Sequence, residues 1–134
     1  MKFNAQTMGY IKVFENTTGA QIKDCFFKEK ELVFIVKEGD LGRALGKKGS
    51  NIRKLAAKLK HPLRIIGFDQ NPIQFVKNIL HSINDYAIEE RDSQIIIKAE
   101  NAQTRGKIYG RDRSNLKWIN ELLKKYFNKE ALIE

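Results

Sequence analysis

The chain has 134 residues, 42% of them apolar, which is enough for one ordinary domain or two very small ones with a packed core. Its 25 lysines and arginines outnumber 16 acidic residues, and the net charge of +9 favours a polyanionic partner, either a nucleic acid or an anionic membrane surface. The apolar runs are too short to span a membrane, and the first residues lack an apolar signal core. The single cysteine, Cys25, excludes an internal disulfide and a zinc site of several cysteines, and a cytoplasmic location fits best.

The positive charge is concentrated in the first half of the chain. Residues 1–67 hold 14 basic and 6 acidic residues, a net charge of +8, whereas residues 68–134 hold 11 and 10, a net charge of +1. Residues 43–60 hold seven basic residues and no acidic one. We therefore expect the first half to bind an anion more strongly than the second.

Hydrophobic periodicity and turn residues predict six elements in the first half. In chain order they are a helix over residues 6–17, strands over 20–27 and 32–36, a short helix over 41–45, a helix from residue 50, and a strand over 63–66. Gly19 should end the first helix, Asp40 should cap the second and Ser50 the third. Residues 32–36 are continuously apolar, so both faces of that strand should be buried.

The second half repeats the same order after a short linker at residues 69–72. Asn71 as N-cap and Pro72 in the first turn mark a helix start. The further elements expected are strands over 86–90 and 94–99, helices over 102–109 and 114–127, and a last strand over 131–133. The two halves therefore share the order α-β-β-α-turn-α-β.

The turn between the two helices of the first half has the sequence Gly46-Lys47-Lys48-Gly49. Two glycines permit positive φ and leave no side chain between the backbone and a ligand. The following helix offers free N–H groups and the positive end of its dipole. A positive turn that is rich in donors suits a phosphate chain that passes at close range.

A residue-level repeat supports a duplicated module. Shifting the sequence by 64 positions aligns like residues without gaps. The matches are Gly42 with Gly106, Arg43 with Lys107, Gly46 with Gly110, Lys47 with Arg111, Ser50 with Ser114, Asn51 with Asn115, Ile52 with Leu116 and Arg53 with Lys117.

The glycine turn, set between two helices and surrounded by three strands, resembles the GxxG loop of the KH RNA-binding module. The element order is similar to the type II form, and two such modules in tandem resemble the short archaeal form of the transcription factor NusA. The resemblance implies an α+β fold of two tandem type II KH modules, residues 1–68 and 69–134, each a three-stranded mixed sheet packed against helices. It also implies binding of single-stranded RNA in transcription elongation or termination, with RNA polymerase as a candidate partner and no cofactor.

Carried over by position, the resemblance assigns roles in the first module. The four turn residues Gly46, Lys47, Lys48 and Gly49 form the phosphate clamp, Arg43, Arg53 and Lys54 are flanking cations, and Ala44, Leu45 and Ile52 are candidates for the wall of the RNA groove. The corresponding residues of the second module are Gly110, Arg111, Arg113, Lys107 and Lys117.

The turn of the second module departs from the motif. Its sequence is Gly110-Arg111-Asp112-Arg113, so an acid stands inside the turn and an arginine replaces the second glycine. Asp112 within ~5 Å of a phosphate would cost about 1 kcal/mol. Because Arg113 also removes the conformational freedom of glycine, we expect the second site to be weaker or mainly structural.

Enzymatic motifs do not fit the sequence, and no small-molecule substrate is expected. A Walker A loop ending at Gly46-Lys47 would need a glycine in place of Leu41 and a serine or threonine in place of Lys48. Glu89 and Glu90 lie on one expected strand, where adjacent side chains point to opposite faces. Neither histidine has partners at metal-ligand spacing, so no metal is expected.

Two other functions remain open at this stage. Residues 50–60 could act as the recognition helix of a helix-turn-helix that binds duplex DNA, although the neighbouring strands argue against it. A ribosomal or ribosome-assembly protein could use a KH module mainly as a scaffold. Among the remaining residues, we expect Cys25 to be buried in a strand, His61 to lie at the surface, and Trp118 to lie off the inward face of its helix.

Overall fold

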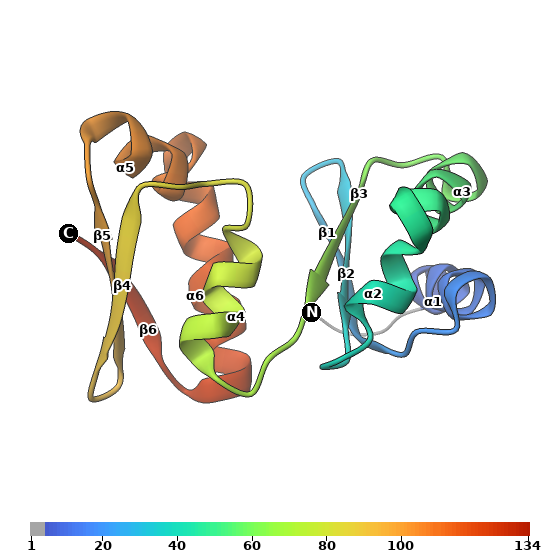
Figure 1. Ribbon diagram of the computed structural model, residues 1–134, viewed down its shortest axis with the longest axis horizontal. Coiled ribbons are helices and arrows are strands. Elements are labelled where there is room, and N and C mark those ends of the chain that lie inside the picture. The colour runs from blue at the N-terminus through green and yellow to red at the C-terminus, as the bar shows by residue number, and fades with distance from the viewer. Residues whose placement is uncertain (1–4) are drawn as a thin grey trace. The chain divides into compact units, whose positions relative to one another are not determined.

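The structure is a computed structural model, and it describes residues 5–134. The chain divides into two units, here called the first module (Met1–Asp69) and the second module (Gln70–Glu134). The first contains α1 (Ala5–Thr18), β1 (Ile22–Lys28), β2 (Glu31–Val36), α2 (Leu41–Leu45), α3 (Ser50–Leu59) and β3 (Leu63–Gly67). The second contains α4 (Pro72–Ile79), β4 (Tyr86–Arg91), β5 (Gln94–Ala99), α5 (Ala102–Tyr109), α6 (Ser114–Phe127) and β6 (Glu130–Ile133). The repeated order expected from the sequence is confirmed (Figure 1).

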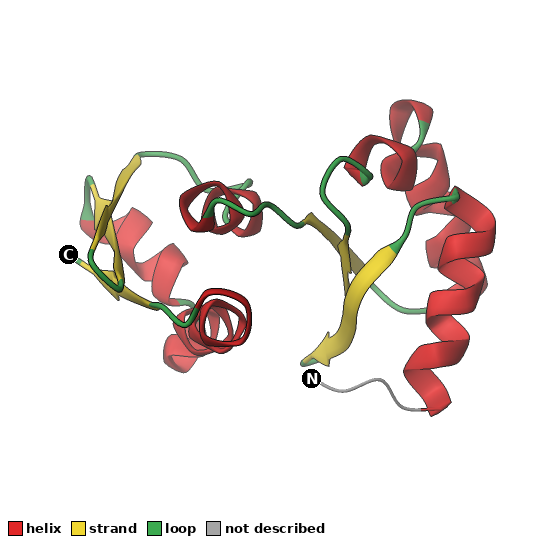
Figure 2. Cartoon of the chain, turned by 90° about the horizontal axis from the view of Figure 1, so that it is seen from below, coloured by secondary structure: helices red, strands yellow, loops and turns green. Residues whose placement is uncertain are grey.

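Each module contains a three-stranded mixed sheet. In the first, β2 is the central strand, antiparallel to β1 and parallel to β3, so that Phe34 lies opposite Cys25 on one side and Ile65 on the other. The second repeats this arrangement, with β5 antiparallel to β4 and parallel to β6. In both modules the helices lie against one face of the sheet (Figures 1 and 2). The expected α+β architecture of two type II KH-like modules is therefore confirmed.

The central strand of the first module supplies much of its core. Residues 32–36 are fully buried, as their continuous apolar sequence predicts. The rings of Phe14 in α1 and Phe34 in β2 stack with centroids 4.3 Å apart, and Leu55 of α3 packs into the same cluster. Each such side chain contributes about 1.5–3 kcal/mol through burial. The core thus fixes α1 and α3 against the sheet and leaves the turn before α3 at the surface.

Helix ends follow the local sequence in two of the four expected cases. Gly19, with φ of 76°, ends α1 as predicted. The side-chain oxygen of Asn71 accepts a hydrogen bond from the Ile73 amide at 2.9 Å, and Pro72 is the first residue of α4, which confirms that helix start.

The other two predicted caps are wrong. Asp40 precedes α2, but its carboxylate accepts from the Gln21 amide at 2.8 Å and does not cap the helix. Ser50 lies inside α3 with helical φ and ψ, and the residue before the helix is Gly49 in a left-handed conformation. The N-terminus of α3 therefore has no side-chain cap, and its first amide, that of Ser50, donates to the Lys47 carbonyl within the turn.

Two other expectations also need correction, while the placement of Cys25 is confirmed. Trp118 is only 5% exposed, so it belongs to the buried side of α6. His61 is half-buried, and its Nε2 lies 3.2 Å from the hydroxyl of Tyr10 while its ring packs against Phe27. Cys25 is fully buried in β1. Within residues 5–134, none of the helices has the length and apolar character needed to cross a membrane.

Candidate functional site

The first loop, residues 46–49, makes a tight turn between α2 and α3 with three residues at positive φ. Gly46 has φ of 72° and ψ of 173°, Lys48 has φ of 54°, and Gly49 has φ of 72° with ψ of 19°. The Gly49 amide donates to the Gly46 carbonyl at 3.3 Å, which closes the turn. The combination of φ and ψ at Gly46 is open essentially to glycine alone, whereas that of Gly49 is left-handed and accessible to other residues at some cost.

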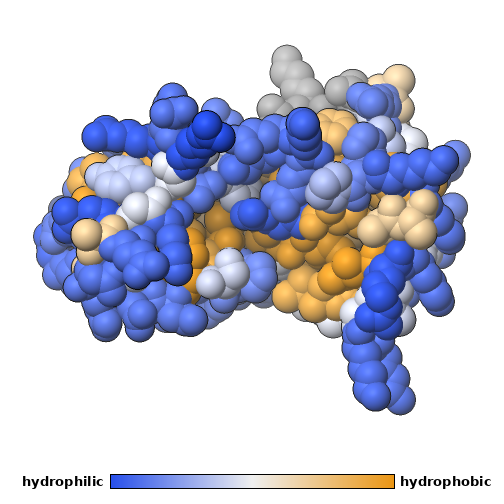
Figure 3. Space-filling view, turned by 90° about the horizontal axis from the view of Figure 1, so that it is seen from above, coloured by the Kyte–Doolittle hydropathy of each residue, from blue (hydrophilic) through white to orange (hydrophobic). Residues whose placement is uncertain are grey.

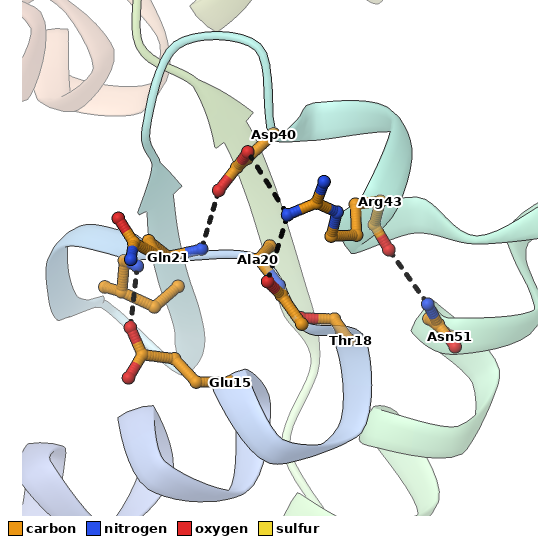
Figure 4. A network of polar contacts seen from close by, with 9 residues as sticks. Glu15, Thr18, Ala20, Gln21, Asp40, Arg43 and Asn51 are labelled. Carbon is orange, nitrogen blue, oxygen red and sulfur yellow. Dashed lines mark hydrogen bonds and ion pairs between the residues drawn. The ribbon is translucent and has the colours of Figure 1, made fainter.

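Asn51 explains why the first glycine has no side chain. A Cβ atom at Gly46 would lie 2.8 Å from the Cγ of Asn51. The Nδ2 of Asn51 donates a hydrogen bond to the Arg43 carbonyl at 2.9 Å, as Figure 4 shows. This bond ties the last turn of α2 to the first turn of α3 across the loop, so Asn51 and Gly46 together fix the loop geometry.

Arg43 extends away from the loop toward the turn between α1 and β1. Its Nη1 donates to the Gly19 carbonyl at 3.4 Å and lies 3.9 Å from the Asp40 carboxylate (Figure 4). Its side chain nevertheless remains 63% exposed. The predicted flanking cation is therefore partly engaged within the protein but still accessible to an anion.

The remaining predicted cations of the first module lie on or beside the loop. Lys47, Lys48 and Lys54 are exposed. Arg53, also exposed, bends back from α3 so that its Nη1 donates to the Lys48 carbonyl at 2.8 Å. Four positive side chains thus surround the uncapped N-terminus of α3, where the helix dipole also favours a negative ligand.

The three predicted wall residues do not share one environment. Leu45 and Ile52 are half-buried and keep some surface beside the loop. Ala44 is fully buried in the core cluster, so its assignment to the groove wall is wrong. Its small side chain instead lets α2 pack closely against the sheet.

The second loop, residues 110–113, has the same backbone conformation as the first. Gly110 has φ of 73° and ψ of 175°, Asp112 has φ of 53°, and Arg113 has φ of 61° with ψ of 22°. Arg113 adopts the left-handed conformation that Gly49 has in the first loop, so the exchange of glycine for arginine does not change the shape of the turn. The left-handed region costs a non-glycine residue about 1 kcal/mol.

The asparagine contact also recurs in the second module. The Nδ2 of Asn115 donates to the Lys107 carbonyl at 3.1 Å, and a Cβ at Gly110 would lie 2.7 Å from the Cγ of Asn115. Neither asparagine has a role that the local sequence predicts, and their match in the repeat is the one signal that points to them. The duplicated contact shows that it belongs to the architecture of the loop.

Side-chain chemistry distinguishes the second loop from the first. Arg111, Asp112 and Arg113 are exposed, as are the flanking Lys107 and Lys117. The four charged side chains predicted for this site are therefore all accessible, and they lie on or beside the turn that begins at Gly110. The second loop and its flanks carry four cations and one acid, whereas the first and its flanks carry five cations and no acid.

Outside the two loops, the acidic side chains of β4 form ion pairs. Glu89 pairs with Arg91 and, at 3.2 Å, with Lys98, and these hydrogen bonds, that of Lys98 above all, hold the pKa of Glu89 below its usual range. Glu90 pairs with Lys129 at 2.6 Å. Among residues 5–134, no group of histidine, cysteine and acidic side chains could hold a metal ion.

Hydrophilic side chains cover most of the face in Figure 3, with apolar ones gathered toward the first module.

Comparison with known proteins gives consistent matches. A family model described as "KH domain" matches residues 9–70. Proteins named "Probable transcription termination protein NusA" match from Methanococcus vannielii (36% identity, 62% of this chain, 48% of that protein) and Methanocaldococcus jannaschii (31%, 87% and 65%). The match thus spans about half of the first relative and just under two thirds of the second. The relative from Thermoplasma acidophilum is 22% identical over 95% of this chain and 90% of its own. A solved structure, "Crystal structure of APE1850", aligns with a TM-score of 0.71 and 27% identity over 98% of this chain and all of that one.

Proposed function

We propose that this chain, which contains a segment matching the KH domain family and is similar to archaeal proteins named NusA, binds single-stranded RNA and acts in transcription elongation or termination. The observation that carries the proposal is the first loop. Lys47 and Lys48 are exposed on a glycine-framed turn at the uncapped start of α3, inside the segment that matches the KH family. Nascent RNA is the ligand that agrees both with a phosphate-binding loop and with relatives that are named for transcription termination.

The proposed mechanism is binding without bond chemistry. Phosphates lie against the loop and the start of α3, where lysines and backbone amides meet them. Leu45 and Ile52, the half-buried residues beside the loop, meet the bases. A module of this kind contacts about four nucleotides. With ~3–4 phosphates neutralised per site, log K should fall with log[salt] with a slope of about −2 to −3.

The test compares two loops that have the same backbone. Lys47→Asp combined with Lys48→Asp should remove most RNA binding, because it places two acids in the phosphate path. Arg111→Ala combined with Arg113→Ala should remove less. Lys124→Asp with Lys125→Asp on α6 is a control of equal charge change. Circular dichroism checks folding, and equal losses for both loop variants would refute the assignment of the first loop as the principal clamp.

Two experiments distinguish the alternatives. In a competition assay, duplex DNA at a concentration equal to or lower than that of a labelled single-stranded RNA should not displace it. Displacement would refute the RNA proposal and favour a helix-turn-helix that binds duplex DNA. A ribosome-assembly role predicts that the protein cofractionates with ribosomal subunits. The transcription role instead predicts cofractionation with RNA polymerase, and crosslinking in cells with sequencing of the attached RNA should then recover nascent transcripts.

A further inference from the structure

The two loops have the same backbone conformation and, together with the residue before each, differ at four positions, one of which, Lys47 to Arg111, keeps its positive charge. Tyr109 replaces Leu45 directly before the loop, and Asp112 and Arg113 replace Lys48 and Gly49 within it. The charge surrounding the second loop is therefore lower than that surrounding the first, which weakens its attraction for phosphates. The same exchange introduces an aromatic ring and a planar guanidinium, neither of which the first loop has at these positions.

The ring and the guanidinium lie together. The Cζ of Arg113 is 5.3 Å from the centroid of the Tyr109 ring, within the range of a cation–π contact. Tyr109 is half-buried and Arg113 is exposed, so the pair lies at the protein surface. The left-handed φ of 61° at Arg113 places an arginine where the first loop has glycine, and residues held in such conformations cluster at ligand-binding sites.

An unpaired nucleobase is the ligand that matches this surface. Bases stack on aromatic rings and on guanidinium planes, and they do so without strong sequence preference because every base has a π face. A phosphate gains nothing from the tyrosine ring, and Asp112 repels it. The second loop thus combines a weaker phosphate clamp with a larger stacking surface.

We propose that Tyr109 and Arg113 form a stacking platform for one unpaired base, so that the second module holds RNA mainly through a base and the first mainly through phosphates. This inference rests on the proposed RNA-binding function. Under this proposal the second loop is also an RNA-binding site, but it contacts a base, whereas the first loop contacts phosphates.

The test uses Tyr109→Leu, which copies the residue that the first module has at this position and should therefore fold. The probe is an oligouridine of about twelve nucleotides, longer than two sites of about four nucleotides each. Tyr109→Leu should raise the Kd about 5- to 100-fold and leave the salt slope unchanged, because stacking releases no counterions. Tyr109→Phe keeps the ring and should bind like the unmodified protein.

A matched oligomer of abasic ribose phosphate separates stacking from structural damage. On this probe the Tyr109→Leu variant and the unmodified protein should bind equally, since no base is present. Unchanged affinity of Tyr109→Leu for oligouridine would overturn the proposal, and so would an equal loss on both probes. Failure of the unmodified protein to bind oligouridine at all would instead refute the RNA-binding function itself.

Discussion

Gly110→Ala should destabilise the second module strongly, although it adds a single methyl group. The φ of 73° and ψ of 175° at Gly110 lie in a region that costs other residues of order 1–3 kcal/mol. The new Cβ would lie 2.7 Å from the Cγ of Asn115, so that side chain must move. Movement breaks its hydrogen bond to the Lys107 carbonyl, which is worth about 1 kcal/mol. The expected loss of unfolding free energy is therefore about 2–4 kcal/mol.

The measurement is urea unfolding, monitored by the fluorescence of Trp118. This is the single tryptophan of the chain, and it is buried on α6, the helix that follows the second loop. Its emission should shift to longer wavelength when the second module unfolds. The midpoint of the transition and its slope together give the free energy of unfolding.

Arg113→Gly is the matched control in the same loop. Relief of the left-handed strain gains about 1 kcal/mol. Loss of the contact with Tyr109 and the greater freedom of glycine in the unfolded chain cost about 0.5–1 kcal/mol each. This variant should therefore lie within about 1 kcal/mol of the unmodified protein. If Gly110→Ala cost no more than Arg113→Gly, the steric account of the first glycine would be refuted.

Three further predictions concern other contacts. Asn51→Ala should lower the stability of the first module by about 1 kcal/mol and speed amide exchange in the loop, because its bond to the Arg43 carbonyl is lost; unchanged exchange would contradict this. Burial, with a smaller contribution from its acidic neighbour, raises the pKa of Cys25 to about 12. Because the thiol ionises more easily in the unfolded chain, the free energy of unfolding should fall by about 1.4 kcal/mol per pH unit between about pH 9 and about pH 12, relative to Cys25→Ala at the same pH. Parallel pH profiles of the two proteins would contradict this. Asn71→Ala should cost about 1 kcal/mol through the lost cap, measured by urea unfolding against Asn71→Asp, which retains the cap.

Strand and helix positions could be read from the sequence because they follow hydrophobic periodicity and local signals. The β2 strand was evident from five consecutive apolar residues, and the α4 start from Asn71 followed by Pro72. The caps expected of Asp40 and Ser50 failed for a different reason. Asp40 is engaged by the Gln21 amide, which lies 19 residues away in the chain and close to it only in the folded module. Local spacing contains no information about such a partner.

The two loops show most clearly what the sequence determined alone. The repeated turn could be predicted from the offset of 64 residues and from the order of elements around it. The distribution of lysines and arginines predicted that the first loop binds an anion more strongly than the second. Tertiary structure decided how each turn is held. Asn51 and Asn115 reach back across their loops to a carbonyl of the preceding helix, and that contact dictates which glycine is required.

Only the structure showed that Arg113 fits the second glycine position and that its guanidinium lies over Tyr109. The reason is physical: φ and ψ at a turn depend on how the two helices on either side pack, and a residue can be held in a costly conformation when that packing fixes it. Composition and spacing specify the residues available to a site. The folded core determines which of them meet, and at what strain.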